Sequence, residues 1–280
     1  AAQMLYNALD CDRVRYDYVL DTTSSTLTGT TQLTSTDETL LEDKFDAVKV
    51  EGIVVANEIA NLETSGHLND ERTRILVTNY EDQEYYGAAA NDDGIYTRTV
   101  DFSVTTGMNE LGRKVFFYVE KESTSTNAEV LGSVILSDEN RVVTSYSADP
   151  FTDVADDNNL DLVSDTQYIY NYAQMDTLDV EKLPSFDGKV GIEKTLVDTD
   201  ADGDVNYVLY KEMGLGKVTA HTTASDGQIV VNVNNGNFIN KDSADVIGFE
   251  DVAKDDYVLT AYIGGRLYVQ TAETITGTIE

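Results

Sequence analysis

Alternating apolar and polar positions dominate this chain and predict short β-strands. The period of two is clearest at residues 74–80, 95–104 and 115–119, and it returns at 168–172 and 257–263. Short strands at regular spacing, separated by turn residues, are typical of antiparallel sandwiches and barrels. The pattern therefore predicts an all-β protein made of tandem small antiparallel β-sandwich or barrel modules.

Turn-forming residues between these runs predict tight hairpins. Glycine after asparagine or aspartate, or a glycine pair, supplies the positive φ that short hairpin turns require. Hairpin turns are predicted at Asn91-Asp92-Asp93-Gly94, Ser225-Asp226-Gly227, Asn234-Asn235-Gly236 and Gly264-Gly265.

The N-terminal region differs from the rest. Residues 1–10 place Met4, Leu5, Ala8 and Leu9 on one helical face, the only segment that we interpret as a helix. A strand is expected at residues 14–20. The following residues, 22–36, are mostly Ser and Thr, and we interpret them as a polar loop or linker that could carry O-linked sugar outside a cell.

Four strand-like runs lead into a glycine and directly into a new strand. Glycine allows the backbone to change direction between domains, so these positions are candidate seams. The spacing between them suits small β domains. We expect an N-terminal segment at 1–46 and β modules at 47–131, 132–215 and 216–280; the candidate seams are Gly52, Gly132, Gly216 and Gly277.

The charge is the strongest chemical property of the chain. A formal net charge of −32 repels nucleic acid and anionic membranes, so neither is an expected partner. It also opposes compaction unless cations bind the carboxylates, and an acidic solubilising coat is the other interpretation. No apolar stretch approaches the roughly 20 residues of a membrane helix. The one cysteine, Cys11, excludes a disulfide within the chain.

The ends of the chain suggest a connection beyond it. Residue 1 lies inside the predicted helix, and residue 280 follows the last candidate seam. We expect either a piece of a longer protein or a terminal strand, Thr274–Ile279, that pairs edge to edge with a neighbouring subunit.

One acidic segment has the spacing of a cation-binding loop. Carboxylates at positions 1, 3 and 5 with glycine at 6 can surround a calcium ion, while position 7 offers a backbone carbonyl and position 9 a side-chain oxygen. Position 12 is Leu209, so the glutamate of a helical calcium loop is missing, and the flanks predict strands. An acidic β-turn without an ion is the alternative. The predicted structural Ca²⁺ ligands are Asp198, Asp200, Asp202, Asp204 and Asn206.

Other polar clusters give weaker signals. The acidic run at 149–165 has no fixed ligand spacing and is expected to be a solvated loop. Tyr85-Tyr86 and the tyrosines at 168, 170 and 172 could stack on sugar, but cross-strand pairing is the simpler interpretation. His67 and His221 are the two histidines, and neither has a motif that predicts catalysis. We expect no enzymatic activity.

Two segments resemble a known family. Residues 1–9, Ala-Ala-Gln-Met-Leu-Tyr-Asn-Ala-Leu, resemble the closing helix of a surface-layer homology repeat of Gram-positive cell-surface proteins. Residues 196–204, with Tyr207-Val208, Gly216-Lys217-Val218 and 272–278, are similar to the β region that follows those repeats. The resemblance implies an exported protein whose β domains form a surface lattice or fibre. The wall-binding repeats themselves are missing, so attachment to wall polysaccharide is assigned to no residue of this chain.

These observations predict a structural protomer of an extracellular bacterial surface layer or fibre, stabilised by calcium, whose partners are copies of itself. Cell-wall polysaccharide would be contacted only through regions outside this chain. The alternatives are an adhesin or glycan-binding spacer module of a larger wall-anchored protein, and an accessory stretch of a secreted polysaccharide hydrolase.

Overall fold

The computed structural model describes residues 2–9, 11–21, 28–78, 98–120, 130–174, 188–189, 191–223, 225, 229–234, 238–242 and 246–273. These residues form one two-stranded ribbon and three larger sheets. The prediction of an all-β fold is confirmed. Three short α-helices accompany the strands in the described part of the chain.

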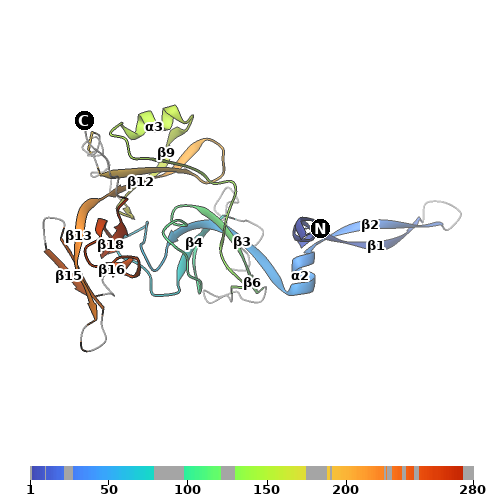
Figure 1. Ribbon diagram of the computed structural model, residues 1–280. Coiled ribbons are helices and arrows are strands. Elements are labelled where there is room, and N and C mark those ends of the chain that lie inside the picture. The colour runs from blue at the N-terminus through green and yellow to red at the C-terminus, as the bar shows by residue number, and fades with distance from the viewer. Residues whose placement is uncertain are drawn as a thin grey trace.

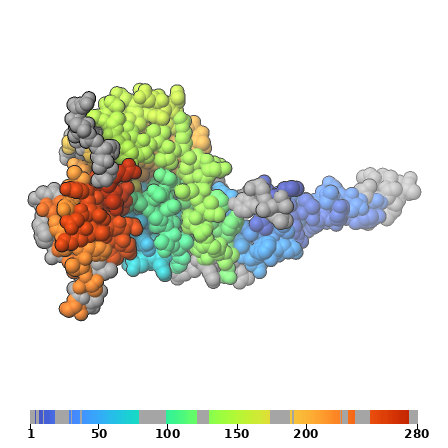
Figure 2. All heavy atoms as spheres, in the orientation of Figure 1, coloured from blue at the N-terminus to red at the C-terminus, as the bar shows by residue number. Residues whose placement is uncertain are grey.

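The N-terminal residues form an arm that projects from the rest of the molecule (Figures 1 and 2). It contains α1 (Ala2–Leu9), the antiparallel pair β1 (Asp12–Asp21) and β2 (Thr28–Thr39), and α2 (Leu40–Phe45). A capping box fixes the start of α2: the Thr39 hydroxyl accepts from the Glu42 amide, and the Glu42 carboxylate accepts from the Thr39 amide. The arm therefore enters the body through a well-defined helical turn.

The Ser/Thr-rich segment is not a loop throughout, and this part of the prediction was wrong. Residues 28–36 lie in β2 and pair with β1 from Val14 to Asp21. Threonine is β-branched and favours strands, so a threonine-rich segment pairs readily once a partner strand lies beside it. Residues 22–27 lie outside the described residues.

The first sheet has the order β5-β4-β3-β6-β7 and is antiparallel throughout. Alternate residues of its central strands are fully buried, as their period of two predicts. Phe102 and Phe117 meet edge to face in this core, with ring centroids 4.8 Å apart. The strands are β3 (Ala47–Ala56), β4 (Thr73–Val77), β5 (Arg98–Phe102), β6 (Lys114–Glu120) and β7 (Ile135–Leu136).

The second sheet has the order β10-β9-β12-β11-β8. Its strands β9 and β12 run parallel, which the prediction of purely antiparallel modules did not include. The members are β8 (Arg141–Ser145), β9 (Asp161–Tyr170), β10 (Ala173–Gln174), β11 (Ile192–Asp198) and β12 (Asp204–Glu212).

The acidic run before β9 contains a helix, α3 (Phe151–Asp157), and the expectation of a solvated loop was wrong. Val154 and Ala155 are buried, and Phe151 lies against the rings of Tyr168 and Tyr210. Three apolar side chains therefore anchor the helix to the sheet, while its aspartates face water. The sequence has too few apolar positions here to display a helical period, so charge masked the pattern.

The third sheet has the order β15-β14-β13-β17-β18-β16. The predicted turn at 264–265 joins the antiparallel strands β17 and β18 and is confirmed. Most residues of the predicted turns at 225–227 and 234–236 lie outside the described residues, and the strands on either side of each pair antiparallel. The 91–94 turn lies outside the described residues. The elements are β13 (Gly214–Thr223), β14 (Ile229–Asn234), β15 (Phe238–Asp242), β16 (Val246–Ile247), the 3₁₀ turn η4 (Phe249–Asp251), β17 (Tyr257–Ile263) and β18 (Arg266–Thr271).

Two of the candidate glycine seams lie inside strands, so those predictions were wrong. Gly52 is in the middle of β3, where an added Cβ would lie 2.4 Å from the Leu76 carbonyl oxygen. The residue is therefore glycine because another strand passes close by. Gly216 lies within β13, two residues after that strand begins.

The other two seams have different outcomes. Gly132 lies in a left-handed conformation, with φ of 102°, shortly before β7. However, β7 still pairs with β6, so the first sheet extends past the predicted boundary at residue 131. Gly277 lies outside the described residues. The division of the chain into modules remains a prediction. Its boundary at 46/47 coincides with the start of β3, whereas those at 131/132 and 215/216 lie before the end of the first sheet and inside β13.

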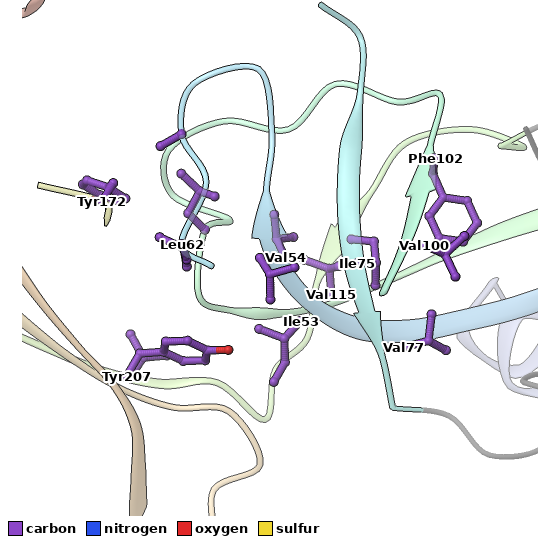
Figure 3. Close-up of a cluster of buried hydrophobic side chains, with 14 of the residues drawn as sticks. Ile53, Val54, Leu62, Ile75, Val77, Val100, Phe102, Val115, Tyr172 and Tyr207 are labelled. Carbon is purple, nitrogen blue, oxygen red and sulfur yellow. The ribbon is translucent and has the colours of Figure 1, made fainter. Parts of the chain in front are cut away.

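One of the three hydrophobic clusters joins the three large sheets, while the second and third sheets each also have a cluster of their own. Side chains of the first sheet meet Val197, Tyr207 and Leu209 of the second and Ile263 of the third. Figure 3 shows Tyr207 and Tyr172 on the side of this cluster that lies next to Leu62 and Ile53. Because this cluster is continuous, the three sheets form one packed body and not a row of independently packed domains.

The turn between β17 and β18 strengthens this contact. An added Cβ at Gly264 would lie 2.1 Å from the Ile59 carbonyl oxygen, so the turn lies directly on the loop that follows β3. The Arg266 guanidinium donates a hydrogen bond to the Glu58 carbonyl on the same loop. Among the described residues, none of the helices has the length and apolar character that a membrane span requires.

Candidate functional site

The predicted cation loop connects β11 to β12 at one end of the second sheet. Asp198, the last residue of β11, is fully buried. Its Oδ1 accepts hydrogen bonds from the amides of Asp200, at 3.2 Å, and Ala201, at 2.8 Å. Its Oδ2 accepts from the amide of Gly203 at 3.1 Å. One carboxylate therefore holds the backbone of the whole loop.

Two residues of the loop adopt left-handed backbone conformations. Ala201 has φ of 58° and Gly203 has φ of 101°. The conformation at Gly203 suits glycine, as the sequence pattern predicted for position 6. The resulting sharp turn brings alternate aspartates toward one point.

Three of the five predicted ligands converge. One carboxylate oxygen from each of Asp198, Asp200 and Asp202 lies within 4.8 Å of the others. Hard oxygen donors at this separation match the chemistry of Ca²⁺, which takes several carboxylate and carbonyl oxygens. The donor set therefore fits a calcium ion, although aspartates also gather in turns without one.

The other two predicted ligands have different positions. Asp204 is not part of the converging group. The Asn206 amide oxygen accepts hydrogen bonds from the Thr199 amide, at 2.6 Å, and from the Thr199 hydroxyl, at 2.7 Å. Asn206 thus closes the neck of the loop across the two strands.

Like charges accumulate around the loop. The pKa of Asp200 is raised, first by burial and then by the carboxylates of Asp202 and Asp198. The pKa of Asp204 is also raised, by burial and by Asp202, followed by Asp161, Asp198 and Asp165. A bound cation would relieve this repulsion.

Asp161 and Asp165 are part of this acidic surface, and the sequence did not predict them there. They belong to β9, which runs parallel to β12, with Asp161 opposite Asp204. The amide of Asp161 also donates to the Gly203 carbonyl at 2.9 Å. A parallel neighbour from about 40 residues away has no local signature in sequence, so only the topology reveals this proximity.

The remaining candidate residues are scattered. The His67 ring lies within 2.7 Å of the Leu68 carbonyl on an exposed loop, and the His221 ring lies within 2.8 Å of the Val252 carbonyl in the third sheet. Tyr168 and Tyr170 pack on the core of the second sheet. Tyr85 and Tyr86 lie outside the described residues.

Comparisons with known proteins give no family for this chain, because no family model, curated protein or solved structure matches it. Function must therefore be argued from the geometry of the molecule.

Proposed function

We propose that this chain is a structural protomer of an extracellular bacterial surface layer or fibre, which assembles with copies of itself through the projecting arm. The observation that carries the proposal is the apolar face of the β1–β2 ribbon. Val14, Tyr16 and Tyr18 alternate on one face of β1, and Leu33 lies opposite Tyr16 on β2. Each of these side chains is more than half exposed, from 56% for Leu33 to 75% for Tyr16.

An exposed apolar ribbon has a physical need for a partner. An isolated two-stranded hairpin is marginally stable in water, and contiguous exposed apolar side chains mark interaction sites. In the described part of the chain, β1 and β2 pair only with each other, so each also has an outer edge of unpaired backbone groups. A second copy can cover the apolar face and pair with an edge.

Charge explains why calcium belongs in the same proposal. Two copies that each carry a net charge of −32 repel one another unless cations neutralise part of it. We propose that Ca²⁺ binds the converging carboxylates of Asp198, Asp200 and Asp202, with Asp204 and Asn206 at the rim. Such an ion would serve as structure and as charge compensation, not as a reagent.

The test measures assembly of the full chain by sedimentation velocity and electron microscopy, with excess calcium and with EDTA. We expect ordered polymers with calcium that dissolve on chelation. The variant Tyr16→Ser/Leu33→Ser should remain monomeric in calcium. Leu215→Ser/Tyr262→Ser is the matched control, because it removes an exposed leucine and tyrosine from the body and leaves the arm intact. A monomer under all conditions, or polymers of the arm variant, would contradict the proposal.

A further inference from the structure

A cavity of about 460 Å³ lies where the three large sheets meet. Its wall comes from the segment between β5 and β6, from strands of the second sheet and from β18 of the third. This volume is within the range of small-molecule sites, which are few in a protein and often lie between packed units. The polar residues that matter for its chemistry are Arg113, Tyr146, Tyr172, Glu193, Lys211 and Tyr268.

A buried ion pair forms one part of the wall. Lys211 Nζ lies 2.8 Å from Glu193 Oε1, and the two side chains are only 9% and 15% exposed. The Tyr146 hydroxyl donates to Glu193 Oε2 at 3.1 Å, and Lys211 Nζ also lies 5.8 Å from the centroid of the Tyr268 ring. Charges held in this way are preorganised, so they can bind a ligand without rearranging.

Tyr172 occupies an unusual turn at the cavity. It and Asn171 are the two residues between the paired Tyr170 and Ala173, with φ of 59° and 48°. A two-residue turn with both φ values positive strongly favours glycine at the second position, and a tyrosine there is strained. The Tyr172 side chain is buried and lines the cavity. Strained backbone conformations of this kind cluster at binding sites and ligand clamps.

The residues that line the cavity carry a net positive charge, whereas the protein as a whole is negative. Two cations, Arg113 and Lys211, face one carboxylate, Glu193, although the chain carries a net charge of −32. Lys211 is paired with Glu193. The partly buried Arg113 forms no ion pair with another residue in the described ranges. An unpaired guanidinium at a cavity is suited to a carboxylate, which it can bind through two parallel hydrogen bonds.

We propose that this pocket binds a small polyhydroxylated ligand that carries one carboxylate, namely a hexuronic acid unit. Arg113 pairs with the carboxylate. The ring of Tyr268, which is only partly buried, provides apolar surface for the sugar ring, whose carbon face is apolar and whose edges are polar. The Glu193 carboxylate and the Tyr172 hydroxyl form hydrogen bonds with the sugar hydroxyls. This inference does not depend on the proposed assembly function.

The electrostatic influences on the pKa of Tyr172 agree with this arrangement of side chains around the cavity. Burial raises the pKa of Tyr172, the Glu193 carboxylate and Tyr268 raise it further, and Arg113 lowers it. All four side chains line the same cavity.

The test is calorimetric titration of the full chain with sodium glucuronate, glucose and sodium acetate. We expect glucuronate to bind with a stoichiometry of one, and glucose and acetate each to bind at least about tenfold more weakly. Arg113→Gln should weaken glucuronate binding roughly 10- to 100-fold, as expected for a lost charge-assisted hydrogen bond. Arg15→Gln, which removes the same charge from the exposed arm, should leave binding unchanged.

A second variant tests the tyrosine without endangering the fold. Tyr172→Phe keeps the buried ring in the shared cluster and removes only the hydroxyl, so it should keep the protein folded and still weaken glucuronate binding. Equal binding of acetate and glucuronate would overturn the sugar part of the proposal. Equal binding of glucose and glucuronate, or full affinity in Arg113→Gln, would overturn the carboxylate part. Absence of binding by all three compounds would overturn the site.

Discussion

The buried carboxylate of Asp198 accepts a hydrogen bond from the amide of Gly203, 3.1 Å away across the turn between β11 and β12. The same side chain accepts from two further amides of the loop. Asp198 therefore has a structural role in the loop before any ion is considered, whereas the exposed Asp200 and Asp202 make a smaller contribution to loop geometry. This difference allows the folding and binding roles of the loop to be separated.

Asp198→Ala should destabilise the protein even in EDTA. It leaves three backbone amides without their acceptor, and we expect a loss of about 1–3 kcal/mol in the free energy of unfolding. Asp202→Ala should change that free energy by less than about 0.5 kcal/mol in EDTA, as for most exposed substitutions, but should abolish the rise in stability on adding calcium. Urea denaturation with and without calcium measures both effects. Equal stability of the two variants in EDTA would contradict the structural role of Asp198.

Asp200→Asn should raise the melting temperature in EDTA at neutral pH. The folded pKa of Asp200 lies above its ordinary value because of burial and neighbouring carboxylates. In the folded protein the ionised form of Asp200 is therefore disfavoured, which lowers the free energy of unfolding at neutral pH. This penalty disappears as the pH falls through the folded pKa. The gain in the variant should therefore shrink toward pH of about 4.

With calcium present at neutral pH, Asp200→Asn should have a lower melting temperature than the original protein, because the variant has lost one charged calcium ligand. Thermal unfolding followed by circular dichroism across pH provides the measurement. Asp70 lies on an exposed turn between β3 and β4. Asp70→Asn therefore controls for the loss of one negative charge. A gain of the same size in this control would assign the effect to net charge instead of the loop.

Lys211→Met should be strongly destabilising, since it leaves the Glu193 carboxylate buried without its cation. Removal of one partner of a buried pair costs about 3–5 kcal/mol. The double variant Glu193→Gln/Lys211→Met should recover most of this loss, because the isolated charge is then also removed. Chemical denaturation of the single and double variants tests the prediction, and an additive loss in the double variant would refute it.

Gly264→Ala should destabilise the protein much more than Gly265→Ala. Both glycines have positive φ, 59° and 81°, so both changes incur the cost of a left-handed alanine, roughly 1–2 kcal/mol. Only at Gly264 does the new Cβ meet a backbone atom, the Ile59 carbonyl oxygen at 2.1 Å. Hydrogen exchange of residues 57–62 should rise in Gly264→Ala alone, since the clash separates the turn from that loop.

Sequence predicted much of the local structure because local rules govern it. Alternation located the central strands, and Gly264-Gly265 specified a two-residue turn whose register, Ile263 opposite Arg266, is the one found. The loop from Asp198 to Asp204 also lies between two strands, as its flanks indicated.

The errors have a common physical origin, because they concern contacts with distant parts of the chain. Residue 52 is glycine because Leu76 passes beside it, and α3 packs on the sheet through the contact of Phe151 with Tyr210. The acidic surface at Asp161 and the cavity at Arg113 likewise depend on segments far apart in sequence. Neither periodicity nor motif spacing contains this information.

The cluster shared by the three sheets has a practical consequence for expression. A truncated product that stopped after β12 would lack Ala261 and Ile263. It would therefore expose part of the shared cluster, to which Val55 and Leu62 also belong. Excised pieces of this kind are expected to aggregate, and recombinant material should retain every sheet in a single polypeptide.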